Sequence, residues 1–274
     1  MTVTIVGGDK KSLLIADHLR KNGINIRLCG LEKLIGEENI DLKHALKISD
    51  KILLPLPSSR DFVHIHTPFS DTELHLTDLA AFERPSDILS AGLPARFGFT
   101  DYYTDALQIG NAVPSAEGAI KLAIELHPKT LWGSSCAVVG FGRIGKILAD
   151  RLKAFGADVT VTARRDTDLA LASAYNLKNI KTESISNYAF NYDIIFNTVP
   201  HKVITRAVLQ KMRGSAVVID LASGEGGTDF AAAKEFGITA EHALSLPGKV
   251  APKTAAELIS KTVLPLLLES DNNE

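Results

Sequence analysis

A glycine-rich turn, VVGFGRIGK at residues 138–146, constrains the fold of this 274-residue chain more than any other stretch. It ends the apolar run CAVVG and opens a segment with helical periodicity, RIGKILADRLKAFG. Gly140, Gly142 and Gly145 have the spacing that allows a tight turn, close approach of backbone amides to a pyrophosphate, and close packing of helix on strand. Because a second β-branched run follows, the sequence predicts a β-α-β unit that binds a dinucleotide at the helix start.

Strand-like and helix-like segments alternate on both sides of this turn. VTIVGG, INIRLCG, DKILLPLP and DILSAGL read as strands before it, and DVTVTA, YDIIFNTV and AVVIDLAS after it. Such alternation predicts an α/β fold of two domains, each with a mainly parallel sheet, the C-terminal one a NAD(P)-binding Rossmann fold. The predicted bounds are 1–112 for an N-terminal α/β domain on the substrate side, 113–130 for a linking helix, 131–247 for the Rossmann domain, and 248–274 for a C-terminal helix returning to the N-terminal domain.

Helix-start signals delimit the two connecting segments. Pro114 and Ser115 predict a helix that begins with Ser115 as the N-cap. Thr254 and Glu257 have the spacing of a capping box for the terminal helix, which Pro265 should kink or shorten. The last residues, ESDNNE, are polar and are expected to fray.

Composition excludes several classes of function. The formal net charge of −2 argues against a nucleic-acid footprint, and no apolar run is long enough for a membrane span. The N-terminus has no signal-peptide pattern, so we expect a cytoplasmic protein. Cys29 and Cys136 are isolated in apolar surroundings, and we predict reduced core thiols, no disulfide and no metal-binding residues.

Arg164 and Arg165 stand where a dinucleotide-binding unit usually has an acidic residue for the adenosine ribose. An acid would favour NAD, whereas arginines offer planar, charge-assisted donors to a 2′-phosphate. We therefore predict NADP as the cofactor, with NAD less favoured. The alternative is that both arginines are ordinary surface residues. Asp166 and Asp168 lie past the strand end and are expected to be solvated.

Two later strand ends, FNTVP and DLASGEGGTDF, should border the nicotinamide and its ribose, because parallel strands present their carboxyl ends at one edge. Their small and polar residues leave room for a ring. The predicted cofactor-binding residues are Gly140, Gly142, Arg143, Ile144, Gly145, Ala163, Arg164, Arg165, Asn197, Thr198, Val199, Pro200, Leu221, Ala222 and Ser223.

The substrate is expected in the cleft between the domains, facing two helix starts. PSAEGAI would present free amides at Ser115, and LPGKVAPKTAAEL brings Lys249, Lys253 and Thr254. Amides and cations suit a small carboxylated substrate. Each lysine could equally be an ordinary solvated side chain.

Four motifs, NAVPSAEGAI, VVGFGRIGK, DLASGEGGTDF and LPGKVAPKTA, occur in this order and closely resemble the A subunit of dipicolinate synthase from endospore-forming bacteria. The resemblance covers most of residues 105–268, and VTIVGGD fits the family's N-terminal domain. It implies an NADP-dependent Rossmann subunit in an oligomeric assembly with the flavoprotein-like B subunit of dipicolinate synthase. The pair would make dipicolinate from dihydrodipicolinate, or its hydroxylated tetrahydro precursor, in the mother cell during sporulation. The residues implied on the substrate side are Ser115, Glu117, Asp229 and Lys253.

Such a reaction needs a base, because a ring carbon loses hydride to the nicotinamide while a proton must also leave. His201 follows the nicotinamide-lining strand and is one candidate, although it could be a surface histidine. Glu117 and Asp229 are the other candidates, and the sequence does not choose among the three.

Three other functions fit parts of the sequence. A 2-hydroxyacid dehydrogenase would need an arginine soon after DLAS and a histidine–carboxylate pair, and the chain offers GEGGTDF and only His242. An alanine dehydrogenase or transhydrogenase-like enzyme is the runner-up, because that group also has a VDLA…GG-like strand end. A non-catalytic cofactor-binding protein that serves as sensor or scaffold stays open, because no unmistakable catalytic pair is present.

Overall fold

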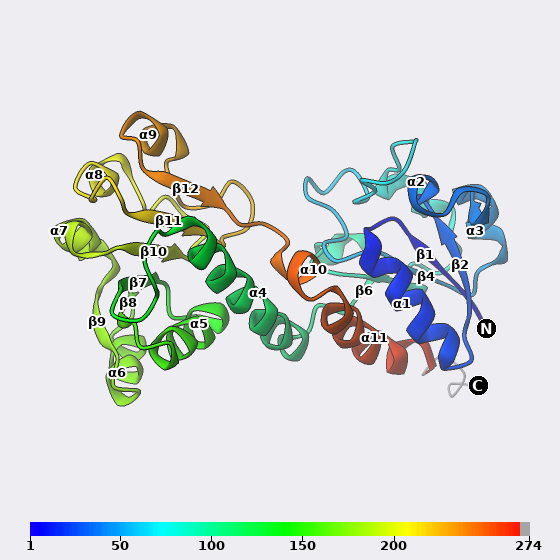
Figure 1. The fold of residues 1–274 in the computed structure, drawn as a ribbon. Helices are drawn as coiled ribbons and strands as arrows, with labels where there is room; N and C mark the ends of the chain where they lie inside the picture. Colours follow the sequence, from blue (N-terminus) through cyan, green and yellow to red (C-terminus); the bar gives the residue numbers. More distant parts are fainter. Residues whose placement is uncertain (269–274) are drawn as a thin grey trace. The chain divides into compact units, whose positions relative to one another are not determined.

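Two six-stranded sheets with only parallel pairing organise residues 1–268, the part of the chain that the computed structural model describes (Figure 1). One unit comprises Met1–Gln108 and the segment from Ala251 onward, and the other comprises Ile109–Val250. The predicted α/β fold with two mainly parallel sheets is confirmed. The terminal stretch ESDNNE, which we expected to fray, lies outside the described residues.

Both sheets have the same strand order. The first runs β3-β2-β1-β4-β5-β6 and the second β12-β11-β10-β7-β8-β9, so a central pair of strands marks a reversal of the order in each. The order reverses between β1 and β4 and between β7 and β10, and ligands bind at such switch points outside the carboxyl ends of the strands. The strands are β1 (Thr2–Val6), β2 (Asn25–Cys29), β3 (Asn39–Ile40), β4 (Lys51–Leu53), β5 (Ile88–Ser90), β6 (Thr100–Asp101), β7 (Ser135–Val139), β8 (Asp158–Ala163), β9 (Lys178–Lys181), β10 (Ile194–Asn197), β11 (Val217–Asp220) and β12 (Thr239–His242).

The sequence predicted eight of these strands and missed β3, β6, β9 and β12. All four are the edges of the two sheets. Edge strands are solvated along one side, so they do not need the apolar runs by which central parallel strands are found.

In the second unit, helices cover both faces of the sheet. Alternate residues of β7 face opposite ways: Cys136 and Val138 join a core cluster with α4, α5 and α6, whereas Ala137 and Val139 join one with α7, α8 and α9. These helices are α4 (Asp105–Leu126), α5 (Arg143–Ala154), α6 (Asp166–Ala174), α7 (Ile185–Tyr188), α8 (Arg206–Leu209) and α9 (Phe230–Glu235). A short helix, α10 (Leu246–Val250), ends the unit.

In the first unit, α1 (Lys10–Lys21) and α11 (Pro252–Leu268) lie side by side on one face (Figure 1). The other face is covered by α3 (Leu42–Ile48) and by a segment that includes the 3₁₀ helix η2 (Leu76–Ala81). The remaining short elements are α2 (Glu32–Ile35) and the 3₁₀ turns at Gly36–Glu38, Pro85–Asp87, Ala95–Phe97, Thr182–Ser184 and Ala189–Asn191. None of the helices in residues 1–268 is long and apolar enough to cross a membrane.

Two predicted helix starts are wrong. Helix α4 begins at Asp105 and passes through Pro114, so Ser115 is not its N-cap; the Ser115 hydroxyl donates to the Asn111 carbonyl at 2.7 Å. Helix α11 begins at Pro252, where the fixed φ of proline suits a first helical position, so Thr254 lies inside the helix and forms no capping box with Glu257. Pro265 does lie within α11, as predicted.

A buried lysine joins the C-terminal helix to the first sheet. Lys51, on the central strand β4, is 6% exposed, and its Nζ donates to the Leu266 carbonyl at 2.6 Å. Leu266 lies in the last described turn of α11. The ammonium group therefore holds this turn of α11 against the central strand of the sheet.

Replacing Lys51 by Met keeps the apolar stem and removes this donor. We expect the free energy of unfolding, measured by urea denaturation, to fall by about 1.5–3 kcal/mol, the usual contribution of a hydrogen bond to a charged group. Lys47→Met, on the exposed surface of α3, is the control and should change the value by less than about 0.5 kcal/mol. Equal stability of the two variants would contradict this role.

Candidate cofactor site

The glycine turn of the second unit has no room for side chains at two of its three glycines. Gly140 follows β7 with φ +97°, and a Cβ there would lie 2.5 Å from Thr198 Oγ1. A Cβ on Gly145 would lie 2.0 Å from the Gly140 carbonyl oxygen, because the first turn of α5 packs directly on the turn. Glycine is thus required at these two positions by the packing of the fold, as the sequence predicted.

Gly142 differs, because the space beside it is open. It is the N-cap of α5, no side chain caps the helix there, and nothing lies within 4 Å of where its Cβ would be. Gly142 therefore offers no side chain to cap the first amides of α5, which carry the positive end of the helix dipole. Open space against uncapped amides fits the pyrophosphate of a dinucleotide.

The two arginines after β8 have different surroundings. Arg165 is paired with Asp168 through a fork of two hydrogen bonds, at 2.8 and 2.9 Å, which raises the pKa of the guanidinium and lowers that of the carboxyl. Arg164 is exposed, and its guanidinium makes no hydrogen bond or ion pair with the described residues. Within residues 1–268, Arg164 is thus the one of the two arginines whose guanidinium group has no partner and could bind a phosphate.

Of the two acidic residues after the arginines, Asp166 is 87% exposed, as the sequence predicted, whereas Asp168 is only 17% exposed, which corrects the prediction for that residue. Asp168 is held by Arg165, and Asp166 pairs with Lys181 Nζ at 2.6 Å. Lys181 also donates to the Arg164 carbonyl at 3.0 Å. Both carboxylates are thus neutralised locally, which reduces their repulsion of an anion beside Arg164.

A buried carboxylate, missed by the sequence analysis, organises the edge where β10 and β11 end. Asp220 is fully buried, and its two oxygens accept four hydrogen bonds of 2.6–3.0 Å. The donors are the Asn197 amide, the backbone amides of Ala222 and Gly227, and the Thr228 hydroxyl. The sequence did contain a signal for this network. Asp220 ends a β-branched strand, and Gly226, Gly227 and Thr228 follow it six to eight residues later.

This network corrects the role predicted for Asn197. Its side chain is fully buried and bonds to Asp220 and to the backbone of Val199, so it cannot line a cofactor pocket. Thr198 also donates back to the Val139 carbonyl, which joins the ends of β7 and β10. The remaining predicted residues of these loops range from buried to exposed: Ala222 is buried, Thr198, Val199 and Leu221 are half-buried, and Pro200, His201 and Ser223 are exposed.

Two of the three predicted bases are engaged elsewhere. Glu117 lies in the middle of α4, not at a helix start, and pairs at 3.3 Å with Arg151 in the last turn of α5, at the opposite end of that helix from the glycine turn. Asp229 is the N-cap of α9 and accepts from the Ala232 amide at 3.0 Å. His201 is the candidate that lies in the loop directly after β10.

The predicted substrate residues are divided between the two units. Lys249 is exposed on α10 of the second unit, and Lys253 and Thr254 are exposed in the first turn of α11 in the first unit. Ser115, partly buried within α4, offers no helix-start amides.

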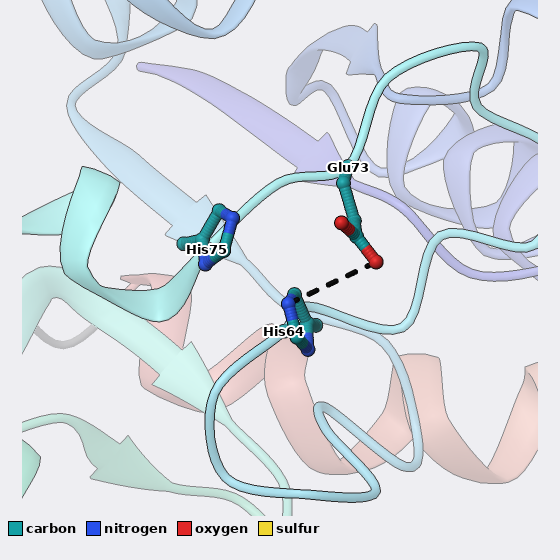
Figure 2. A group of neighbouring side chains, drawn as sticks. All are labelled: His64, Glu73 and His75. Atoms are coloured by element: carbon teal, nitrogen blue, oxygen red, sulfur yellow. Dashed lines mark ion pairs between the residues drawn. The ribbon is translucent and has the colours of Figure 1, made fainter.

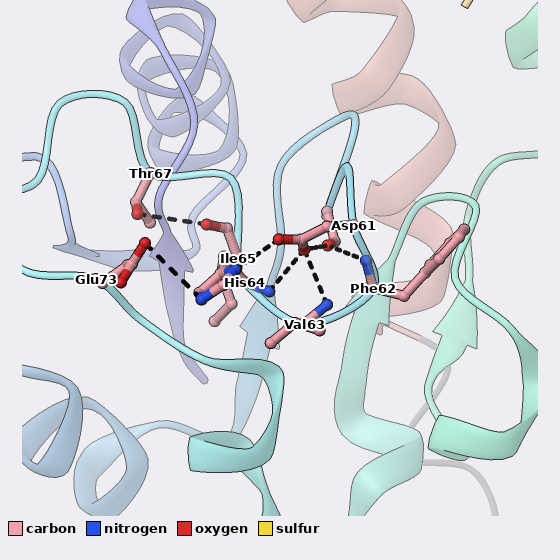
Figure 3. Close-up of polar contacts among 8 residues, drawn as sticks. Asp61, Phe62, Val63, His64, Ile65, Thr67 and Glu73 are labelled. Carbon is pink, nitrogen blue, oxygen red and sulfur yellow. Dashed lines mark hydrogen bonds and ion pairs between the residues drawn. The ribbon is translucent and has the colours of Figure 1, made fainter. Parts of the chain in front are cut away.

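A second polar group lies in the first unit, in the loop after β4. Asp61 accepts hydrogen bonds from the Val63 and His64 amides at 2.9 Å, and its other oxygen lies 2.5 Å from His64 Nδ1 (Figure 3). The hydrogen bond with His64 lowers the pKa of Asp61, and the same bond raises the pKa of His64. The two side chains therefore form a hydrogen-bonded carboxylate–histidine pair.

The second unit defines the class of protein: it is a Rossmann-type nucleotide-binding domain of the dehydrogenase kind. The family described as "D-isomer specific 2-hydroxyacid dehydrogenase, NAD binding domain" matches residues 111–230. The transhydrogenase of Sinorhizobium meliloti, 16% identical with a TM-score of 0.67 over 97% of this chain and 93% of its own, shares the fold. The predicted nicotinamide-cofactor domain is confirmed at this level.

The first unit and the full-length comparisons make the identification specific. The family of N-terminal domains of the dipicolinate synthase A subunit matches residues 2–94. The A subunit of dipicolinate synthase from Bacillus subtilis is 32% identical over 100% of this chain and 98% of its own. The crystal structure of the same protein from Bacillus halodurans is 31% identical, with a TM-score of 0.85 and 98% of each chain covered. The chain belongs to the family of dipicolinate synthase A subunits.

Asp220→Ala should destabilise the second unit strongly, because it leaves buried donors of Asn197, Gly227 and Thr228 without an acceptor. We expect a loss of about 3 kcal/mol or more in the free energy of unfolding, measured by urea denaturation. Asp229→Ala, in the same segment, removes one N-cap and should cost about 1 kcal/mol. A smaller loss for Asp220→Ala than for Asp229→Ala would contradict the network.

The pair of Asp61 and His64 predicts a defined pH dependence. The raised pKa of His64 stabilises the folded state fully below the ordinary histidine pKa, and this stabilisation is lost as pH rises through the raised value. The lowered pKa of Asp61 stabilises the folded state above the ordinary aspartate pKa, and this stabilisation is lost as pH falls through the lowered value. The pair is thus complete between about pH 4 and 6.5. By NMR titration in metal-free buffer, Asp61→Asn should lower the pKa of His64, whereas Asp71→Asn in the same loop should not. An unchanged His64 pKa in Asp61→Asn would exclude the pair.

Proposed function

We propose that this chain is an NADP-dependent oxidoreductase subunit that, together with the B subunit of dipicolinate synthase, converts dihydrodipicolinate or its hydroxylated tetrahydro precursor to dipicolinate. The observation that carries the proposal is the match over the whole length of the chain, including the N-terminal domain, to the A subunit of that enzyme. The family resemblance also leads us to propose an oligomeric assembly acting in the cytoplasm of the mother cell during sporulation.

The uncapped first turn of α5 supports dinucleotide binding, with Gly142 and Arg143 at the pyrophosphate. At the adenosine end, Arg164 supports NADP over NAD, because its guanidinium is exposed while nearby carboxylates are paired with Arg165 and Lys181. A charge-assisted bond to a phosphate contributes about 1.5–3 kcal/mol.

Aromatisation of dihydrodipicolinate removes a hydride and a proton from the ring. A bound nicotinamide supplies the hydride acceptor. The proton needs a base, and His201 is our proposal because it is exposed beside the end of β10 while Glu117 is paired with Arg151 and Asp229 caps α9. Lys249, Lys253 and Thr254 are proposed as donors to the substrate carboxylates, because each is at least partly open to solvent.

The proposal is tested by supplying enzymatically generated dihydrodipicolinate with NADP⁺ or NAD⁺, with and without the B subunit, and following reduced cofactor and aromatic product together. We expect NADP⁺-dependent formation of both. Arg164→Ala should weaken NADP⁺ binding by about tenfold to a hundredfold without weakening NAD⁺ binding. Arg27→Ala, on an exposed position of β2 in the first unit, is the control with unchanged binding of both.

Each other outcome points elsewhere. Turnover of alanine, or exchange between NADH and NADP⁺, would support the alanine dehydrogenase or transhydrogenase-like alternative. Bound nucleotide with no product, even with the B subunit present, would support a non-catalytic scaffold. Equal loss of NADP⁺ and NAD⁺ binding in Arg164→Ala would refute the 2′-phosphate role.

A further inference from the structure

Two histidines of the first unit are brought together by a short antiparallel pairing in the segment that covers the sheet. Two backbone hydrogen bonds, of 2.8 and 2.9 Å, join residues 63–65 to residues 74–76, with His64 directly opposite His75. In such a pair both side chains project from the same side of the ribbon and lie close together. Their ring centroids are 4.6 Å apart.

The backbone that carries these histidines is anchored in the core. Ile65 and Leu76, the residues that follow them, are only 2% and 3% exposed and belong to the apolar cluster beneath the sheet. The His75 amide also donates to the Asp78 carboxylate at 2.8 Å. The two imidazoles are therefore held near each other by packing and not by the mobility of a loop tip.

Glu73 completes the group. It precedes His75 by two residues, so an extended backbone points both side chains the same way. Its Oε1 lies 3.8 Å from His64 Nε2, and one ligand atom from each of His64, Glu73 and His75 lies within 4.8 Å of the others (Figure 2). The Glu73 side chain is 74% exposed and can rotate toward the two rings.

Asp61 determines which nitrogen of His64 faces this group. A carboxylate accepts, so the bond from Nδ1 to Asp61 fixes the proton on Nδ1 and leaves Nε2 toward Glu73 (Figure 3). A histidine that donates its other N–H to a carboxylate is the usual arrangement of a metal-binding imidazole, because the carboxylate orients the ring and raises its basicity.

We propose that His64, Glu73 and His75 bind a divalent transition metal ion of the zinc type, with Asp61 as a positioning residue. Two imidazoles and one carboxylate suit such an ion better than Ca²⁺ or Mg²⁺, which prefer oxygen ligands. Metal–ligand bonds of about 2.0–2.2 Å place tetrahedral ligand atoms roughly 3.4 Å apart, so the ligand atoms need to approach one another by up to about 1.4 Å. Three protein ligands leave a fourth position for water or a solute oxygen.

The test uses the full chain without an affinity tag, stripped of metal by a chelator and titrated with Zn²⁺ alone in calorimetry. We expect one ion per chain. Glu73→Gln and His75→Ala should each weaken binding by about tenfold or more, and Asp61→Asn by a similar factor because it removes the orienting bond. Visible absorption of the Co²⁺-substituted protein should report a site of low coordination number and should be lost in His75→Ala.

His44→Ala, an exposed histidine on α3 of the same unit, is the matched control and should bind zinc like the unmodified chain. Because Glu73 is largely exposed, Glu73→Gln should keep the unfolding midpoint of the parent, which separates lost ligation from lost folding. Absence of stoichiometric zinc binding, or unchanged affinity in both Glu73→Gln and His75→Ala, would overturn the site. Failure of the dipicolinate assay would leave this test unaffected.

Discussion

The close contact between Gly145 and the carbonyl of Gly140 is the constraint from which the cofactor site follows. At a distance of 2.0 Å for a hypothetical Cβ, no other residue fits at position 145 without moving the helix. The contact makes α5 begin directly on the end of β7, and this brings uncapped amides next to the open space at Gly142. The anion-binding role that we propose for this turn thus rests on backbone packing.

The edge of the sheet where β10 and β11 end depends on a different kind of interaction. The buried Asp220 carboxylate gathers the loop after β10 and the loop after β11 by hydrogen bonds alone. A buried charge is tolerated only when its oxygens are fully satisfied, and here four donors satisfy them. As a result Asn197 becomes structural, while the exposed residues beside it, such as His201, remain available for chemistry.

The first unit has the same strand order as the second, but its loops differ. The sequence after β1 lacks the three-glycine spacing of the second unit, and the long segment between β4 and β5 folds over a sheet face that helices cover elsewhere. That segment buries Ile65 and Leu76, whereas His64 and His75, which directly precede them, are half-buried, and Asp61 and Glu73 are exposed. The carboxylate and imidazole groups of Asp61, His64, Glu73 and His75 are together for this reason.

The sequence by itself determined the α/β class, the central strands, the glycine turn and the arginines that follow it, because each of these rests on local periodicity or spacing. The sequence did not predict the four edge strands, because a strand at the solvated edge of a sheet needs no apolar run. Only the tertiary structure decided that α4 runs through Pro114, that Arg165 is committed to Asp168 while Arg164 is not, and that Asp220 is buried. The pairing of His64 with His75 was also visible only in the tertiary structure, because contacts between distant segments depend on strand pairing and burial that no local sequence pattern encodes.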